Sequence, residues 1–78
     1  MITAGTYRHY KGNLYTVIGI AEHTETTEEM VVYVSAGPDG KLWVRPLDVF
    51  AGYVHVAGTT VLRFERVGGS TSNPYGNL

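Results

Sequence analysis

Aromatic and basic side chains are concentrated near the beginning of the chain, in the sequence TYRHYKGNLY. If this segment begins as a strand, Tyr7, His9 and Lys11 share one face, because side chains alternate along a strand. A ring, an imidazole and an ammonium group on one face form a platform for an aromatic anion. The other two tyrosines of the segment, Tyr10 and Tyr15, could instead be core or rim residues whose hydroxyl groups contact solvent. We therefore expect one wall of a site for a small anionic or nucleotide-like ligand.

Trp43 and Arg45 repeat this pattern, because they lie two positions apart and would share a face of a strand. The planar guanidinium of Arg45 is suited to phosphate or carboxylate. Trp43 could instead be the one large core residue of a small domain. Arg45 could instead form a salt bridge, most simply to Glu25 or Asp48. Both interpretations of Arg45 stay open at this point, and both make its removal damaging.

Other polar residues could complete the site. Arg8 adds a cation that could hold phosphate, and Asn13 adds an amide that donates and accepts hydrogen bonds. His23, Glu25 and Thr26 belong to the acidic segment EHTETTEE, for which a solvated loop is the simpler interpretation. We nevertheless expect these three residues to line a second wall of the site, together with the tryptophan–arginine pair.

The sequence contains no pattern that indicates an enzyme, a metal centre or a cofactor. There is no cysteine, which excludes thiol catalysis and thiolate metal sites. No Gly-x-Ser-x-Gly elbow, P-loop or GxGxxG fingerprint is present. The three histidines, His9, His23 and His55, are too far apart for a recognisable ligand motif. We therefore predict a non-catalytic protein without metal or cofactor.

Charge and hydropathy bound the partners and the location. Six Lys and Arg against seven Asp and Glu give a net charge of -1. A protein that depends on many phosphate contacts would be clearly basic, so duplex nucleic acid is disfavoured. No charged leader precedes an apolar run, and no apolar stretch approaches the roughly 20 residues that span a bilayer. We expect no membrane contact and a cytoplasmic location.

Regularly spaced glycines separate short runs rich in valine, isoleucine and tyrosine, which is typical of a small all-β domain. We expect about five strands, at Thr6–Tyr10, Leu14–Ala21, Met30–Ser35, Leu42–Arg45 and Val61–Glu65. Gly19 indicates a bulge or bend, and the Pro-Asp-Gly sequence near residue 38 indicates a hairpin turn. A short helical turn after Pro46 would point Leu47 and Phe50 inward, and the VHV sequence fits either a brief strand or a loop.

The 78 residues form one domain, which we place at residues 1–66, followed by a flexible polar tail at 67–78. A core of this size leaves roughly 3–5 kcal/mol of stability, so a homo-oligomer that hides edge strands is an alternative to very good packing.

The motifs together resemble a small bacterial and phage family, domain-of-unknown-function family 1653, from about Gly5 to Glu65. The matching residues are Gly5, Tyr7, His9, Tyr10, Lys11, Gly12, Tyr15, His23, Glu25, Thr26, Trp43, Arg45, Pro46, Arg63 and Phe64. The resemblance implies a small β-rich, SH3-like barrel and no assigned activity.

Three functions remain open. The first is a binding domain for a small anionic or nucleotide-like ligand, which in a phage could remove a host nucleotide signal from the host cytoplasm. The second is an SH3-like adaptor that binds extended peptides in a groove lined by Tyr7, Tyr10 and Trp43. The third is RNA or single-stranded nucleic-acid binding, against which the net charge and the acidic segment weigh.

Overall fold

The computed structural model describes residues 2–35 and 40–69 of the chain. Within these ranges the protein consists of seven strands and one short helix. Their bounds, in chain order, are β1 Gly5–His9, β2 Leu14–Glu22, β3 Glu29–Ser35, β4 Leu42–Pro46, α1 Leu47–Phe50, β5 Tyr53–Val56, β6 Thr59–Leu62 and β7 Phe64–Gly68. The expected all-β class is confirmed.

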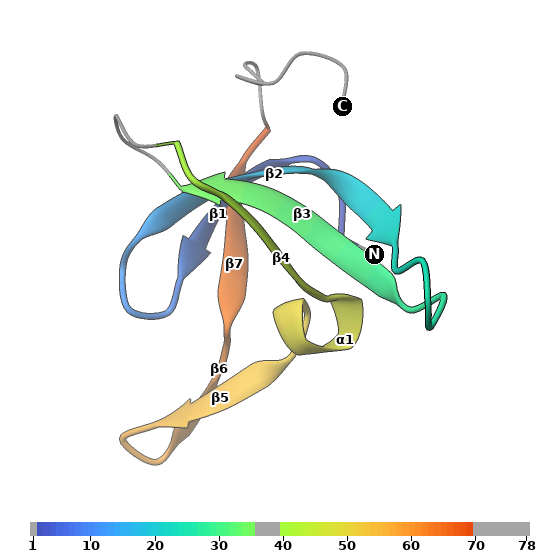
Figure 1. Cartoon of the computed structure of the whole chain (residues 1–78). Coiled ribbons are helices and arrows are strands. Elements are labelled where there is room, and N and C mark those ends of the chain that lie inside the picture. The colour runs from blue at the N-terminus through green and yellow to red at the C-terminus, as the bar shows by residue number, and fades with distance from the viewer. Residues whose placement is uncertain (1, 36–39, 70–78) are drawn as a thin grey trace.

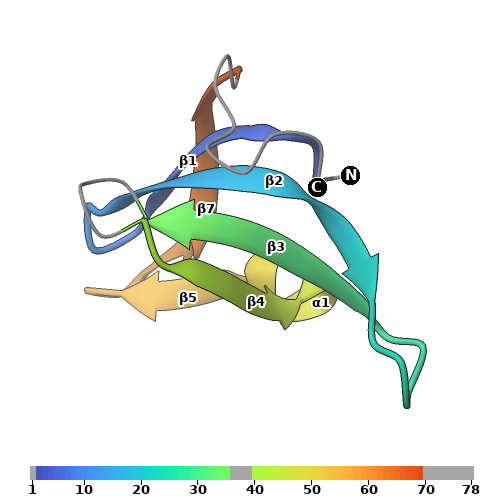
Figure 2. The same cartoon turned by 45° about the horizontal axis from the view of Figure 1, so that its top comes forward.

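The strands form two antiparallel sheets (Figure 1). A five-stranded sheet has the order β4-β3-β2-β1-β7, and β5 and β6 pair as a separate hairpin. The larger sheet curves around α1, and the hairpin projects beneath it (Figures 1 and 2). Within the described ranges β4 and β7 do not pair, so the closed barrel of about five strands that the sequence suggested does not form there.

Two local features confirm the interpretation of glycine and proline in the sequence. The register between β2 and β3 shifts between Val17 and Gly19, which is the expected bulge. Pro46 ends β4 at an edge of the sheet, where its missing N–H costs no ladder bond. The helical turn follows at once, with Phe50 buried and Leu47 packed against the core. The VHV sequence forms β5.

The last predicted strand, Val61–Glu65, is wrong as a single element, because the chain changes sheets at Arg63. The N–H of Arg63 donates to the carbonyl of Gly52 at 3.0 Å. The carbonyl of Arg63 accepts from the N–H of Tyr10 at 2.9 Å. Because these two partners lie on different segments, the residue cannot continue one ladder. Leu62 is therefore exposed on β6, while Phe64 is buried on β7.

The core lies between the concave face of the large sheet and α1. Its buried residues are Tyr7, Val17, Val31, Tyr33, Phe50 and Phe64. The Phe50 and Phe64 rings stack at 4.0 Å between centroids, with 7° between their planes. Tyr7 and Tyr33 meet the Phe50 ring edge-on at 5.4 and 5.3 Å. The core is thus mainly aromatic, with α1 supplying its central ring.

Some expectations concern the segments that the structure leaves undescribed. The Pro-Asp-Gly turn falls largely on residues 36–39, and most of the predicted tail falls on 70–78, so both lie outside the described residues. The first two residues assigned to the tail, Val67 and Gly68, are the last residues of β7. None of the described helical residues forms a segment long and apolar enough to cross a membrane.

Candidate functional site

Tyr7 faces the core and not the ligand, contrary to the expected platform. Its side chain is 3% exposed. Its hydroxyl donates to the carbonyl of Thr3 at 2.8 Å and accepts from the N–H of the same residue at 3.2 Å. Strand alternation was right, because Tyr7 and His9 do share a face, but that face is the concave one that packs on the core. Only its end, at His9, reaches solvent.

His9 lies at the end of β1, among aromatic rings. Its ring centroid is 4.5 Å from that of Tyr10, 4.9 Å from that of Phe64 and 6.5 Å from that of Tyr15. Its Nδ1 accepts a hydrogen bond from the N–H of Lys11 at 3.2 Å. An accepting Nδ1 requires the neutral tautomer that carries its proton on Nε2. The half-buried imidazole is thus held neutral at the edge of the aromatic core.

Three cations lie close enough to this imidazole for their charges to act on it. Burial is the largest cause that lowers the pKa of His9 from its usual 6.5, followed by the charges of Arg45, Lys11 and Arg63. The Arg45 guanidinium lies over the Phe64 ring, 5.4 Å from its centroid. Lys11 lies 5.8 Å from the centroid of the Tyr10 ring. We call the group His9, Lys11, Tyr15, Arg45 and Arg63 the inner rim.

The cations of the inner rim have no carboxylate partner in the part of the chain that the structure describes, where the single ion pair joins Arg8 to Glu65. The salt bridge from Arg45 to Glu25 or Asp48, one of its two open interpretations, is therefore not formed among the described residues. Arg45 instead acts on the hydroxyl of Tyr33 by charge and by a side-chain hydrogen bond, which both lower its pKa, although burial dominates and raises it.

The side chain of Arg63 has a hydrogen-bond donor that is not satisfied. Its Nε is buried and has no hydrogen-bond partner. A buried donor without an acceptor costs about 1–3 kcal/mol, so an acceptor that reached it would be bound favourably. The inner rim therefore combines positive charge, ring surface and at least one unused donor.

Trp43 is an exposed residue of β4 and not the large core residue of the domain. Its side chain is 43% exposed, and its indole Nε1 donates to Ser35 Oγ at 3.2 Å. Lys41 lies 5.0 Å from the centroid of the indole ring. Trp43 and Arg45 do share the concave face, because they pair with Tyr33 and Val31 of β3.

The second predicted wall is not assembled. The β2–β3 turn contains His23, Glu25 and Thr26. This turn lies at the opposite end of β2 from the β1–β2 turn (Figure 1). The Nδ1 of His23 accepts from the backbone N–H of Glu25 at 3.1 Å and of Thr26 at 3.4 Å. These exposed residues therefore form a turn that is closed by its own side chains, away from the inner rim.

Asn13 and Arg8 occupy different surroundings. The carbonyl of Asn13 accepts from the N–H of His9 at 2.8 Å, so this residue closes the turn next to the inner rim. Arg8 points away from the core and forms its exposed ion pair with Glu65 at 3.7 Å. Only His9, Lys11 and Arg45 of the predicted ligand residues thus gather at one place, with Asn13 beside them.

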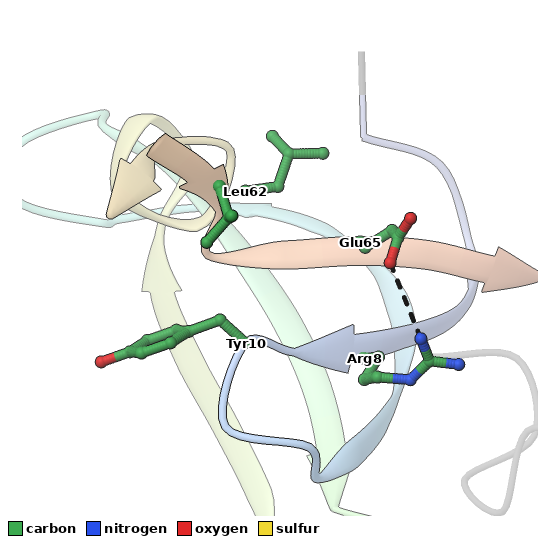
Figure 3. A pocket seen from close by; sticks show the side chains of 5 residues that line it. Arg8, Tyr10, Leu62 and Glu65 are labelled. Atoms are coloured by element: carbon green, nitrogen blue, oxygen red, sulfur yellow. Dashed lines mark ion pairs between the residues drawn. The ribbon is translucent and has the colours of Figure 1, made fainter. Parts of the chain in front are cut away.

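Arg8 and Glu65 border a groove on the outer surface (Figure 3). Its volume is about 400 Å³, and its lining residues are Arg8, Tyr10, Val61, Leu62 and Glu65. The groove joins one exposed ring and two aliphatic side chains to a weak ion pair, which is worth about 0–1 kcal/mol. A ligand that inserted between Arg8 and Glu65 would therefore break their ion pair at little cost in free energy.

Sequence reasoning left Tyr15, Phe64 and Arg63 out of the ligand set. Arg63 and Phe64 are neighbours in the RFE sequence, and the structure brings both of them close to His9. Their approach to His9 depends on the sheet switch at Arg63, which strand periodicity does not predict. Among the described residues, no group of three His, Cys, Asp or Glu side chains could hold a metal ion.

Acid is expected to weaken the protein through His9. Its folded pKa lies below the unfolded value of about 6.5, so the unfolded chain binds the proton first as the pH falls. The free energy of unfolding should therefore drop from pH 7.5 to 5, and less in His9→Gln. Urea unfolding at both pH values measures this difference. His55→Gln, in the exposed β5 strand, is the control. Equal acid sensitivity of the wild type and His9→Gln would contradict the assignment.

Comparison with known proteins gives one family and one related structure. The model of the family described as protein of unknown function (DUF1653) matches residues 5–66. The crystal structure of a protein of the same family from Bordetella bronchiseptica is similar, with a TM-score of 0.80 and 32% sequence identity. The similarity covers 92% of this chain and 95% of that one. No curated protein matches.

Proposed function

Because this chain belongs to the DUF1653 family, whose description assigns no activity, we propose its function from the geometry of the inner rim. The protein is a non-catalytic binding domain for a small anionic, nucleotide-like ligand. The observation that carries this proposal is the cluster of three cations around a neutral imidazole, without a carboxylate partner in the described part of the chain. The positive charge of this cluster is not balanced by a neighbouring carboxylate of the described residues, so a bound anion would be stabilised there.

The rim offers the two kinds of contact that a nucleotide needs. Arg45 presents a planar guanidinium, which binds phosphate in a bidentate manner, and Lys11 adds a point charge. The half-buried Tyr15 presents ring surface within the inner rim, and the exposed Trp43 lies outside the rim on the same concave face. Stacking of one base on an aromatic side chain is worth about 1–3 kcal/mol. Charge and stacking together give a site for a compact ligand, whereas a long phosphate backbone would meet the acidic turn at residues 22–29.

Native mass spectrometry of the freshly purified protein is the direct test. We expect a co-purifying small molecule that carries phosphate or carboxylate and is released on denaturation. The same protein, stripped of ligand, is then titrated with adenosine monophosphate, adenosine and inorganic phosphate while its amide NMR signals are followed. We expect adenosine monophosphate to perturb signals at His9, Lys11 and Arg45 and to bind more tightly than either part alone. Signal changes confined to the outer groove, or none with any anion, would overturn the proposal.

A second candidate function is favoured by the outer groove in Figure 3. Its exposed Tyr10 and Leu62 could receive apolar side chains of an extended peptide. The groove that the sequence suggested for such an adaptor is not assembled, because Tyr7 is buried and Trp43 lies on the concave face. Salt separates the two functions, since anion binding at the inner rim weakens steeply with ionic strength and apolar peptide binding does not.

The broader setting of the proposal is a cytoplasmic protein, and the host cytoplasm if a phage encodes it. There a ligand-binding domain without an active site would act by removing a nucleotide signal from solution. The lack of cysteine suits a reducing compartment. The strongly curved sheet with a helical turn before its last strands supports an SH3-like relationship, although its strands leave the barrel open.

A further inference from the structure

Strand β4 is an edge of the large sheet and is unusually open. It pairs with β3 alone among the described strands. Leu42, Trp43 and Val44 are three consecutive exposed apolar residues, and Val44 is 59% exposed. An edge strand that is apolar and regular is a template for a further strand, which most proteins prevent with charges, bulges or prolines. Residues 42–44 contain none of these devices, which stand only at the ends of the run, as Lys41 before it and as Arg45 and Pro46 after it.

Among the described strands, none pairs with the outer side of the β4 backbone. The N–H of Ser35 donates to the carbonyl of Lys41 at 3.1 Å. In an antiparallel ladder the bonded pairs alternate, so Trp43 and Arg45 direct their backbone groups toward β3. Leu42 and Val44 therefore direct their N–H and C=O groups away from the sheet. Pro46 follows in the same outward series, where its missing N–H breaks no bond to β3.

The opposite edge of the same sheet is protected. Strand β7 carries Glu65 and Arg66, and its pairing with β1 shifts register between Thr6 and Tyr7. Arg66 also folds across the N-terminal segment, donating to the carbonyl of Ala4 at 3.0 Å. Charge and a bulge are the usual means of blocking an edge. On β4 the comparable residues, Arg45 and Pro46, stand at one end of the strand, so the apolar run of residues 42–44 stays accessible to a partner strand.

We propose that β4 pairs antiparallel with β4 of a second copy of this chain, so that two sheets join into one across a two-fold axis. Antiparallel pairing of two identical edges is self-complementary, which a symmetric dimer requires. Charge selects the register. A pairing centred on Trp43 would place Lys41 opposite Arg45 of the second copy, and like charges directly opposite each other destabilise a sheet. A pairing centred on Val44 separates them and brings the two Val44 side chains together.

The dimer also supplies what a small domain lacks. A domain of this size has a small core and little stability to spare, and the new ladder adds buried apolar surface and backbone bonds. Because the net charge is only -1, two copies of the chain repel each other weakly. Because one short strand per chain buries less than a standard interface, we expect micromolar dissociation and not an obligate complex.

Sedimentation velocity over a concentration series from about 5 µM to 1 mM tests the pairing of β4. We expect the wild-type mass to rise from one to two chains across this range. Val44→Lys places two ammonium groups opposite each other while keeping the N–H, and we expect it to stay monomeric at every concentration. Val67→Lys makes the same change at an exposed position of β7, and we expect it to dimerise like the wild type.

Amide hydrogen exchange provides a second readout that does not depend on a variant. In the wild type, exchange at Leu42 and Val44 should slow as concentration rises, because their outward N–H groups enter the new ladder. Exchange at Trp43, which already donates toward β3, should not change. A wild type that is monomeric at 1 mM, or a dimer that Val44→Lys leaves intact, would overturn the proposal. Slower exchange at β7 in place of β4 would overturn it as well.

Discussion

Phe50→Ala is expected to unfold the protein at room temperature. Phe50 is fully buried, stacks on Phe64 and meets Tyr7 and Tyr33 edge-on, so its ring joins α1 to both halves of the sheet. Replacement of a buried phenylalanine by alanine costs about 3–5 kcal/mol. This loss equals the whole stability of roughly 3–5 kcal/mol that a domain of this size retains. Half or more of the molecules should therefore be unfolded in buffer.

Circular dichroism and urea unfolding measure this effect. The matched control is Val49→Ala, because Val49 precedes Phe50 in α1 but is exposed. It should change the free energy of unfolding by no more than about 0.5 kcal/mol, as surface substitutions usually do. A Phe50→Ala protein that still unfolds cooperatively within 1 kcal/mol of the wild type would show that the stacked ring is not the centre of the core.

Arg45→Ala is expected to remove binding of small anions while the fold persists. Arg45 is half-buried, lies over the Phe64 ring and has no carboxylate partner among the described residues. A hydrogen bond to a charged group contributes about 1.5–3 kcal/mol. Affinity for adenosine monophosphate should therefore fall by about tenfold to 150-fold. The lost contact with Phe64 costs about 1–2 kcal/mol and the lost hydrogen bond to Tyr33 about 1 kcal/mol, so the fold is expected to persist with reduced stability.

Arg8→Ala is the matched control for this variant. It removes the same type of side chain, from a residue on the outer face that is paired with Glu65. Its affinity for adenosine monophosphate should stay within about twofold of the wild type, because long-range charge effects are screened by salt. Isothermal titration calorimetry gives both affinities, and circular dichroism checks both folds. If Arg8→Ala weakens binding more than Arg45→Ala does, the outer groove holds the ligand.

The local elements of this fold follow from the sequence, because they depend on neighbouring residues. The β-branched run Leu14–Ala21, the bulge near Gly19 and the helical turn after Pro46 each obey a short-range preference. The division of the last strand at Arg63 does not. It is fixed by two backbone hydrogen bonds, one to Gly52 across the β5–β6 hairpin and one to Tyr10, which is distant in sequence, and no periodicity encodes them.

The candidate site was predictable in part for the same reason. Alternation correctly placed Tyr7 with His9, and Trp43 with Arg45, on shared faces. Alternation does not show which of the two faces packs inward. A buried tyrosine whose hydroxyl bonds to the backbone cannot be distinguished by sequence from an exposed tyrosine. Alternation also could not reveal that the β2–β3 hairpin is long enough to carry His23 away from the inner rim. Curvature of the sheet, which brings Arg45 over Phe64, is a property of the whole fold.

The strand order has a consequence for how this protein is made. The first strand, β1, pairs on one side with its neighbour β2 and on the other with β7, the last strand. A growing chain on the ribosome can build the β1–β2–β3–β4 meander early, but it then exposes one side of β1 and the Phe50 ring until Phe64 emerges. Such distant pairings slow folding to the millisecond-to-second range. Strand β7 must therefore be synthesised before the domain can close, and chains that stop before β7 are expected to be substrates for chaperones and proteases.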